Sequence, residues 1–364
     1  MHREERAMAR GVTLVFPAVN QAAVDYLTDA KERGELVMAA ASAFGVGISE
    51  TNVQLLRLPM IYDPKFESEL NSLILSHGIT RVFCPVAAVH DFMSKRIALG
   101  EFPLTLIGKS PIQRQVEQHR ALMERARELQ GFSSVCAEEG KCSTELEVAS
   151  LLKHGGQIYG ESNDDKLAAM VGIFASAPKG DVVEIGSLMG RSAFVLQFLS
   201  ALHDIGPLLT VDPWQADNAI QHDSPQQFQS LVDVWDFEVL AQGFAVNVLP
   251  YGIGRHAHLR MASEQGYDVY AAVQPIEGVS GSPIAYSGKI AVLHIDGNHD
   301  FAQVARDVEM WVPHLVQGGW LILDDYLWAH GDGPHREGDR LLQELADRIE
   351  RAFVCGKALF LRFL

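Results

Sequence analysis

Short apolar runs separated by helix-length segments are the feature that most limits the fold of this chain. After residue 144 such runs lie at 182–185, 208–211, about 257–261, 290–294 and 320–323. Segments with helical periodicity fill the gaps, at 191–203, 225–242, 301–314 and 337–350. Strands that alternate with helices are typical of a parallel sheet covered on both faces. Two last apolar runs, at about 352–356 and 358–363, predict an antiparallel hairpin. The pattern predicts a seven-stranded, doubly wound, Rossmann-like α/β sheet over residues 144–364.

The first part of the chain repeats this alternation on a smaller scale. Its apolar runs lie at 12–17, 37–41, 53–60 and 80–85, and its helical segments include 20–33 and 65–77. No GxGxxG motif follows the first run, so the sequence does not predict a dinucleotide site there. We expect a Rossmann-like accessory domain over residues 1–110, for dimerisation or for covering an active site. Residues 111–143 are then a connecting helix and linker.

Composition excludes several classes of function. Thirty Lys and Arg against 46 Asp and Glu give a net charge of −16, which disfavours a nucleic-acid partner because no basic patch is visible. No apolar stretch approaches the ~18 residues that a membrane helix needs. The charged N-terminal residues lack the apolar core of a signal peptide, and four scattered cysteines suit neither a disulfide scaffold nor a zinc site. We expect a cytoplasmic protein without a membrane or nucleic-acid partner.

A glycine-rich turn follows the apolar run at 182–185. The segment Val182-Val-Glu-Ile-Gly-Ser-Leu-Met-Gly-Arg-Ser192 contains Gly186 and Gly190 and leads into a helix. Glycines let a backbone approach a bound ligand, and the start of a helix offers unpaired N–H groups. Glu184 beside the turn disfavours a pyrophosphate and favours a ligand with positive or hydroxyl groups, such as S-adenosylmethionine. The alternative is an ordinary tight turn.

A second acid, Asp212, ends the apolar run at 208–211. A carboxylate at this edge of a nucleotide-binding sheet commonly accepts ribose hydroxyls, although Asp212 could instead cap a turn before Pro213. Together the two motifs resemble the class I S-adenosylmethionine-dependent methyltransferases. The resemblance implies that the acid and the glycine turn hold the amino-acid end of the cofactor and that Asp212 holds its ribose. The cofactor-binding residues expected on this basis are Glu184, Gly186, Ser187, Gly190, Asp212 and, near the adenine, Ser263.

Three aspartates follow two later apolar runs at the same edge of the predicted sheet. Asp296 ends the first run, and Asp324 with Asp325 ends the second. Three carboxylates at neighbouring strand tips repel one another strongly unless a cation lies between them. Oxygen ligands suit Mg²⁺, with Mn²⁺ or Ca²⁺ as substitutes. The alternative is that these side chains cap a helix and a turn. Nearby His299 could accept a proton at neutral pH.

The segments 290–300 and 318–326 resemble the metal-dependent O-methyltransferases of antibiotic biosynthesis, which include macrocin, mycinamicin and novobiocin-sugar methyltransferases and cephalosporin-hydroxylase-like sequences. The resemblance covers about residues 145–364. It implies that Asp296, Asp324 and Asp325 bind Mg²⁺ and that His299 is the general base. The implied reaction is methyl transfer to a hydroxyl of a small molecule, as in secondary metabolism. We expect the acceptor to contact Asn298, Tyr326, His330 and a loop formed by the Gly-, Ser- and Pro-rich stretch 264–289.

Other functions are compatible with these motifs. An N-methyltransferase or another enzyme could use the same fold, and so could a non-catalytic protein that binds the cofactor. A metal-dependent hydroxylase would normally need iron with histidine ligands, whereas the predicted set is all carboxylate. The accessory domain also makes a homo-oligomer a reasonable expectation.

Overall fold

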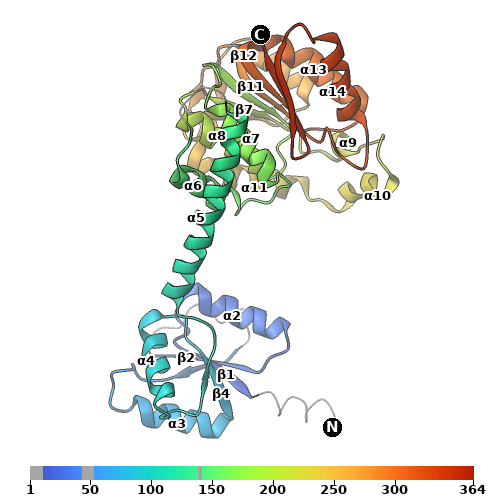
Figure 1. Cartoon of the computed structure of the whole chain (residues 1–364). Helices are drawn as coiled ribbons and strands as arrows, with labels where there is room; N and C mark the ends of the chain where they lie inside the picture. Colours follow the sequence, from blue (N-terminus) through green and yellow to red (C-terminus); the bar gives the residue numbers. More distant parts are fainter. Residues whose placement is uncertain (1–10, 43–52, 138–141) are drawn as a thin grey trace. The chain divides into compact units, whose positions relative to one another are not determined.

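The computed structural model describes residues 11–42, 53–137 and 142–364. The chain divides into two compact units, Met1–Ala121 and Leu122–Leu364. Helix α5 (Pro111–Cys136) runs across the boundary between them (Figure 1). Among the described residues, no helix combines the length and the apolar character that crossing a bilayer requires.

The first unit is a parallel five-stranded sheet with the strand order β3-β2-β1-β4-β5. Its strands are β1 (Val12–Val15), β2 (Val37–Ala41), β3 (Leu55–Arg57), β4 (Ile79–Phe83) and β5 (Thr105–Leu106). Its helices are α2 (Gln21–Glu32), α3 (Phe66–His77) and α4 (Ala87–Ala98). The alternation of apolar runs and helical segments therefore predicted this part of the fold correctly.

The second unit is a seven-stranded sheet with the order β13-β14-β12-β11-β6-β7-β8. Its strands are β6 (Asp181–Ile185), β7 (Leu208–Val211), β8 (His256–Leu259), β11 (Ile290–Ile295), β12 (Leu315–Leu323), β13 (Ile349–Cys355) and β14 (Ala358–Phe363). Every pairing is parallel except those of β14, which is antiparallel to both β12 and β13. The predicted doubly wound sheet with a terminal hairpin is confirmed.

Helices cover both faces of this sheet, and each face has its own hydrophobic core. Successive strand residues point to opposite faces, so Val182 packs in one core and Val183 in the other. The first core lies against α5, α6 (Glu145–Gly155), α7 (Asp164–Phe174), α8 (Arg191–Leu202) and α11 (Phe237–Gly252). The second lies against α12 (Ser263–Ala271), α13 (Phe301–Trp311) and α14 (Gly333–Glu344). Because both faces are buried, the strands read as continuous apolar runs.

The single helix predicted over 225–242 is not observed. The segment instead forms α10 (Gln226–Gln229) and a 3₁₀ helix over Ser230–Val234, and α11 begins only at Phe237; α9 (Ala216–Ala219) precedes them. The break has a local cause, because the side chain of Asp236 accepts a hydrogen bond from the N–H of Val239 and so caps a new helix.

The stretch 264–289 does not form the expected substrate-facing loop. After α12 it continues as a short hairpin of β9 (Ile276–Glu277) and β10 (Pro283–Ile284). The hydroxyl of Tyr286 donates to the carbonyl of Leu208, and the N–H groups of Ser287 and Gly288 donate to Asp181. Leu208 and Asp181 begin their strands, so this segment packs at the amino edge of the sheet, opposite the edge where ligands bind in such folds.

Gly186 allows the tips of β6 and β11 to meet. Its φ of +81° lies in the left-handed region, and a Cβ atom on it would lie 2.2 Å from the carbonyl oxygen of Asp296. A side chain at this position would therefore clash with backbone, which cannot move aside as a flexible side chain could. The glycine of the motif is required by this close approach between strand tips.

We predict that Gly186→Ala destabilises the second unit by about 2 kcal/mol or more, from backbone strain and the clash together. Gly254→Ala is the matched control, because Gly254 has a φ of +71° and nothing within 4 Å of its ideal Cβ position. That control should cost only about 1 kcal/mol, from the left-handed backbone conformation alone. Urea unfolding of both variants checks the difference, and equal losses of stability would contradict the proposed clash.

Candidate active site

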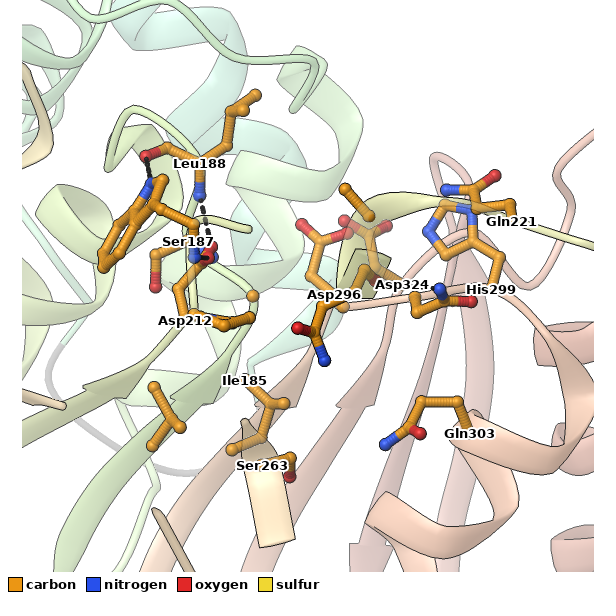
Figure 2. A pocket seen from close by; sticks show the side chains of 18 of the residues that line it. Ile185, Ser187, Leu188, Asp212, Gln221, Ser263, Asp296, His299, Gln303 and Asp324 are labelled. Atoms are coloured by element: carbon orange, nitrogen blue, oxygen red, sulfur yellow. Dashed lines mark hydrogen bonds between the residues drawn. The ribbon is translucent and has the colours of Figure 1, made fainter. Parts of the chain in front are cut away.

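A cavity of about 590 Å³ opens at the carboxyl edge of the second unit's sheet (Figure 2). Eight of the ten site residues predicted from the sequence line it, and Glu184 and Gly190 are the two that do not. The eight are Gly186, Ser187, Asp212, Ser263, Asp296, His299, Asp324 and Asp325. The glycine turn and the three aspartates therefore face one continuous space.

Asp212 holds the glycine turn in place. Its Oδ2 accepts hydrogen bonds from the N–H groups of Ser187 (2.8 Å) and Leu188 (3.1 Å; Figure 2), and its Oδ1 accepts one from the backbone N–H of Trp214 (2.9 Å). Leu188 and Trp214 have φ angles of 45° and 43°, a costly conformation for side chains of this size. A carboxylate oxygen accepts about two hydrogen bonds, so Oδ1 retains room for one more donor, such as a single ribose hydroxyl.

Glu184 and Gly190 stabilise the glycine turn through contacts outside the cavity. Glu184 is fully buried; it accepts a hydrogen bond from the hydroxyl of Ser187 (2.9 Å), and its other oxygen lies 2.9 Å from Nδ1 of His294. Gly190 precedes α8, where a Cβ atom would lie 2.9 Å from the ring of Phe244. The geometry thus gives both residues contacts with the protein rather than with the cavity.

Ser263 and Asp307 form the wall at the far end of the cavity. Ser263 accepts a hydrogen bond from the indole N–H of Trp311 (3.0 Å) and also bonds to the Asp307 carboxyl. Burial raises the pKa of Asp307 to about 7, although Ser263 and Gln303 act in the opposite direction. The sequence analysis missed Asp307. It occupies a position of the apolar stripe 304, 307, 308, 311 on α13, and an acid in such a stripe is the signal that was available.

The three predicted aspartates and His299 line the cavity, and His294 lies buried beside them. One group of possible metal-ligand atoms comes from His294, Asp296 and Asp324, and another from Asp296, His299 and Asp325. The atoms within each group lie within 4.8 Å of one another. Asp296 belongs to both groups and is 25% exposed. Carboxylate oxygens in this arrangement fit a hard divalent cation such as Mg²⁺.

His299 lies beside Asp325, and only one of its two ring nitrogens contacts that carboxylate. Its Nε2 lies 3.3 Å from Oδ2 of Asp325, and its ring centroid lies 4.6 Å from that of Trp328 in a T-shaped arrangement. Within the described part of the chain, Nδ1 is buried and has no hydrogen-bond partner. Burial lowers the pKa of His299 more than the Asp325 carboxylate raises it. A neutral ring that donates from Nε2 would keep Nδ1 as a proton acceptor.

Lys166 is the residue of this site that the sequence analysis missed most clearly. It lies on α7 with a side chain only 2% exposed; its Nζ contacts the Asp324 carboxylate directly and lies 3.7 Å from Asp296. Against the effect of burial, Lys166 and His294 hold the pKa of Asp324 well below its ordinary value. At the rim, Nζ of Lys357 lies 2.6 Å from Oδ1 of Asp325.

The repulsion among the aspartates is therefore relieved in part by the chain itself. The sequence argument required a cation between the carboxylates, and Lys166 supplies one from a helix distant in sequence. His294 adds another positive charge: burial lowers its pKa, but its hydrogen bonds and nearby carboxylates raise it to about 9. Repulsion alone thus no longer demands a metal ion, and the case for one rests on the donor atoms that face the cavity.

The residues expected to contact the acceptor are only partly at the cavity. Asn298 lines it, and its amide donates to the carbonyls of Asn218 and Ile220. Tyr326 and His330 are not among the described residues that line it. The hydroxyl of Tyr326 donates instead to Asp339 of α14 (2.7 Å). Tyr326 was misplaced because its ring packs in the hydrophobic core beneath α14.

Three solved structures to which this chain shows a weak similarity are described as methyltransferases. The O-methyltransferase NovP is 16% identical, with a TM-score of 0.42 over 67% of this chain and 98% of its own. CalS11, a calicheamicin methyltransferase, is 14% identical, with a TM-score of 0.40 over 70% and 94%. MycE, a methyltransferase of the mycinamycin pathway solved with Mg, SAH and mycinamycin VI, is 15% identical, with a TM-score of 0.29 over 51% and 45%. All three TM-scores lie below 0.5.

The family comparison is more direct. No curated protein matches the sequence. The family described as "Methyltransferase domain" matches residues 183–326, which run from β6 past the tip of β12 and include all eight predicted residues that line the cavity. Residues 183–326 therefore match a methyltransferase domain, and the prediction that this part of the chain is a methyltransferase is confirmed.

Proposed function

We propose that this methyltransferase transfers a methyl group from S-adenosylmethionine to a hydroxyl of a small-molecule acceptor, with Mg²⁺ held by Asp296, Asp324 and Asp325. One observation carries the proposal: the glycine turn and the acidic strand tips line the same cavity. The two parts are in direct contact, because Gly186 packs against the backbone of Asp296. The motif resemblance adds a natural-product acceptor to the proposal.

The aspartates supply a site for the metal ion on the acceptor side of the cavity. Asp296 is the most exposed of the three and faces the open space, whereas Asp324 and Asp325 are buried. When bound, Mg²⁺ would stabilise the deprotonated form of an acceptor hydroxyl. Because the carboxylates follow rigid strands, their positions would change little on binding.

His299 is the general base of the proposed reaction. Asp325 orients the imidazole through Nε2, and the ring takes the proton from the acceptor hydroxyl. The acceptor oxygen then bonds to the methyl carbon while the carbon–sulfur bond breaks and the sulfur keeps its electron pair. The lowered pKa of His299 keeps the ring neutral at pH 7, as this role requires.

On the side of the cavity proposed for S-adenosylmethionine, the residues of the chain hold the methyl donor in position. Asp212 fixes the turn that faces the donor and offers one acceptor atom to its ribose. Ser263 and Asp307 border the space at the end proposed for the adenine. Holding the two substrates in line in one cavity removes much of the entropic cost of their encounter.

We predict that His299→Ala retains cofactor binding but loses turnover by about 10²–10⁴-fold, as expected for loss of a general base. Turnover is measured as S-adenosylhomocysteine formed with a panel of sugars, catechols and N-hydroxy compounds, and binding by calorimetry. His119→Ala, a change at an exposed histidine of α5, serves as the control and should behave like the wild type. Near-normal turnover of His299→Ala would remove His299 from the role of base.

We predict that removal of divalent metal abolishes turnover and that Mg²⁺ or Mn²⁺ restores it. Cofactor binding should survive chelation, because the turn is held by hydrogen bonds to Asp212, which is not among the proposed metal ligands. Calorimetric titration with S-adenosylmethionine, in chelator and in Mg²⁺, separates the two effects.

Full turnover in excess chelator would mean that the three aspartates are structural. Cofactor binding without methyl transfer to any hydroxylated acceptor of the panel would instead favour a non-catalytic binding protein. Methyl transfer only to amines would favour the N-methyltransferase alternative.

A further inference from the structure

We infer that Lys166 is a built-in counter-ion of the acid cluster, defined here as Glu184, Asp296, Asp324 and Asp325, and that it weakens the binding of a divalent cation there. The second half of this inference rests on the proposed metal site. Lys166 contacts carboxylates rather than substrates, so it would act as a positioning residue.

The surroundings of Lys166 make it a fixed charge. The side chain is 2% exposed, and its helix is buried from Lys166 to Phe174. The helix begins at a capped end, because the side chain of Asn163 accepts a hydrogen bond from the N–H of Lys166 (2.9 Å). A lysine in the interior is costly unless it is paired, and here its Nζ contacts Asp324 and lies 3.7 Å from Asp296.

The other cations near the cluster do not replace Lys166. His294 is buried below the cavity; its Nδ1 bonds to Glu184, and its Nε2 lies 3.8 Å from Asp296 and 3.7 Å from Asp324 without a hydrogen bond to either. Lys357 approaches Asp325 from the rim, where its side chain is 32% exposed and solvent screens its charge. Lys166 is thus a buried lysine at two of the three aspartates that the proposed metal ion would use.

Two consequences follow for the aspartates. Before any metal binds, Lys166 offsets the repulsion between Asp296 and Asp324 and lets both side chains stay in place. When a divalent cation binds, the ammonium group lies close to it and repels it, because both are positive and both contact the same carboxylates. Removing the charge of Lys166 should therefore lower the stability of the protein without metal. It should also raise the affinity of the aspartates for a divalent cation.

The test uses the full chain and Mn²⁺ alone, without any acceptor. Lys166→Met should bind Mn²⁺ about tenfold more tightly than the wild type or better, measured by the electron paramagnetic resonance signal of free Mn²⁺. Its melting temperature without metal should fall, and Mn²⁺ should raise it by more than in the wild type. Lys166→Gln, which keeps a hydrogen-bond donor but removes the charge, should change in the same direction.

Lys179→Met is the matched control. Lys179 pairs with Asp204 at the exposed surface of the same unit, and neither residue lines the cavity. This variant loses one lysine charge and should keep the wild-type affinity for Mn²⁺. An affinity gain equal to that of Lys166→Met would overturn the inference, because it would reflect net charge alone.

The remaining outcomes also decide the question. Unchanged or weaker Mn²⁺ binding in both Lys166 variants would overturn the inference, and so would variants that stay unfolded even when Mn²⁺ is present during refolding. If either result is obtained while the wild type binds Mn²⁺ and needs it for turnover, only the role of Lys166 is rejected and the proposed metal site stands. If no protein binds Mn²⁺ and wild-type turnover survives chelation, the proposed metal site itself fails.

Discussion

Repulsion among acidic side chains at neighbouring strand tips is the constraint on which the site of the second unit depends. The parallel strands β6, β11 and β12 bring four carboxylates to one edge of the sheet. The chain offsets their charge at three depths, with a buried histidine, a buried lysine and a lysine at the rim. The pairs are His294 with Glu184, Lys166 with Asp324 and Lys357 with Asp325. Asp296 keeps the most open face, and it is the carboxylate that faces the cavity.

The same edge of the sheet joins the two halves of the proposed reaction. The turn that would hold the methyl donor and the aspartates that would face the acceptor meet where Gly186 packs on Asp296. Asp212 then keeps the strained residues Leu188 and Trp214 in their turn conformations. Donor and acceptor sites are therefore fixed by strand packing and backbone hydrogen bonds, which suits a reaction that depends on alignment.

Features that follow from local pattern could be predicted from the sequence. Buried parallel strands are continuous apolar runs, so their ends, and with them Asp212, Asp296 and Asp325, could be assigned to one edge. Features set by contacts between distant segments could not. Lys166 lies 158 residues before Asp324, and nothing near it in sequence indicates its partner. The stretch 264–289 was misjudged for the same reason, since its contacts are with the starts of β6 and β7.

The central claim is that these strand tips hold a divalent cation beside the methyl-donor site. A crystal structure of the protein with S-adenosylhomocysteine and Mn²⁺, with diffraction data recorded at the manganese absorption edge, tests it most directly. The account predicts an anomalous peak in contact with the carboxylates of Asp296, Asp324 and Asp325 and within the same cavity as the ligand. A ligand-bound crystal at saturating Mn²⁺ with no peak there, or with its peak elsewhere, would contradict it.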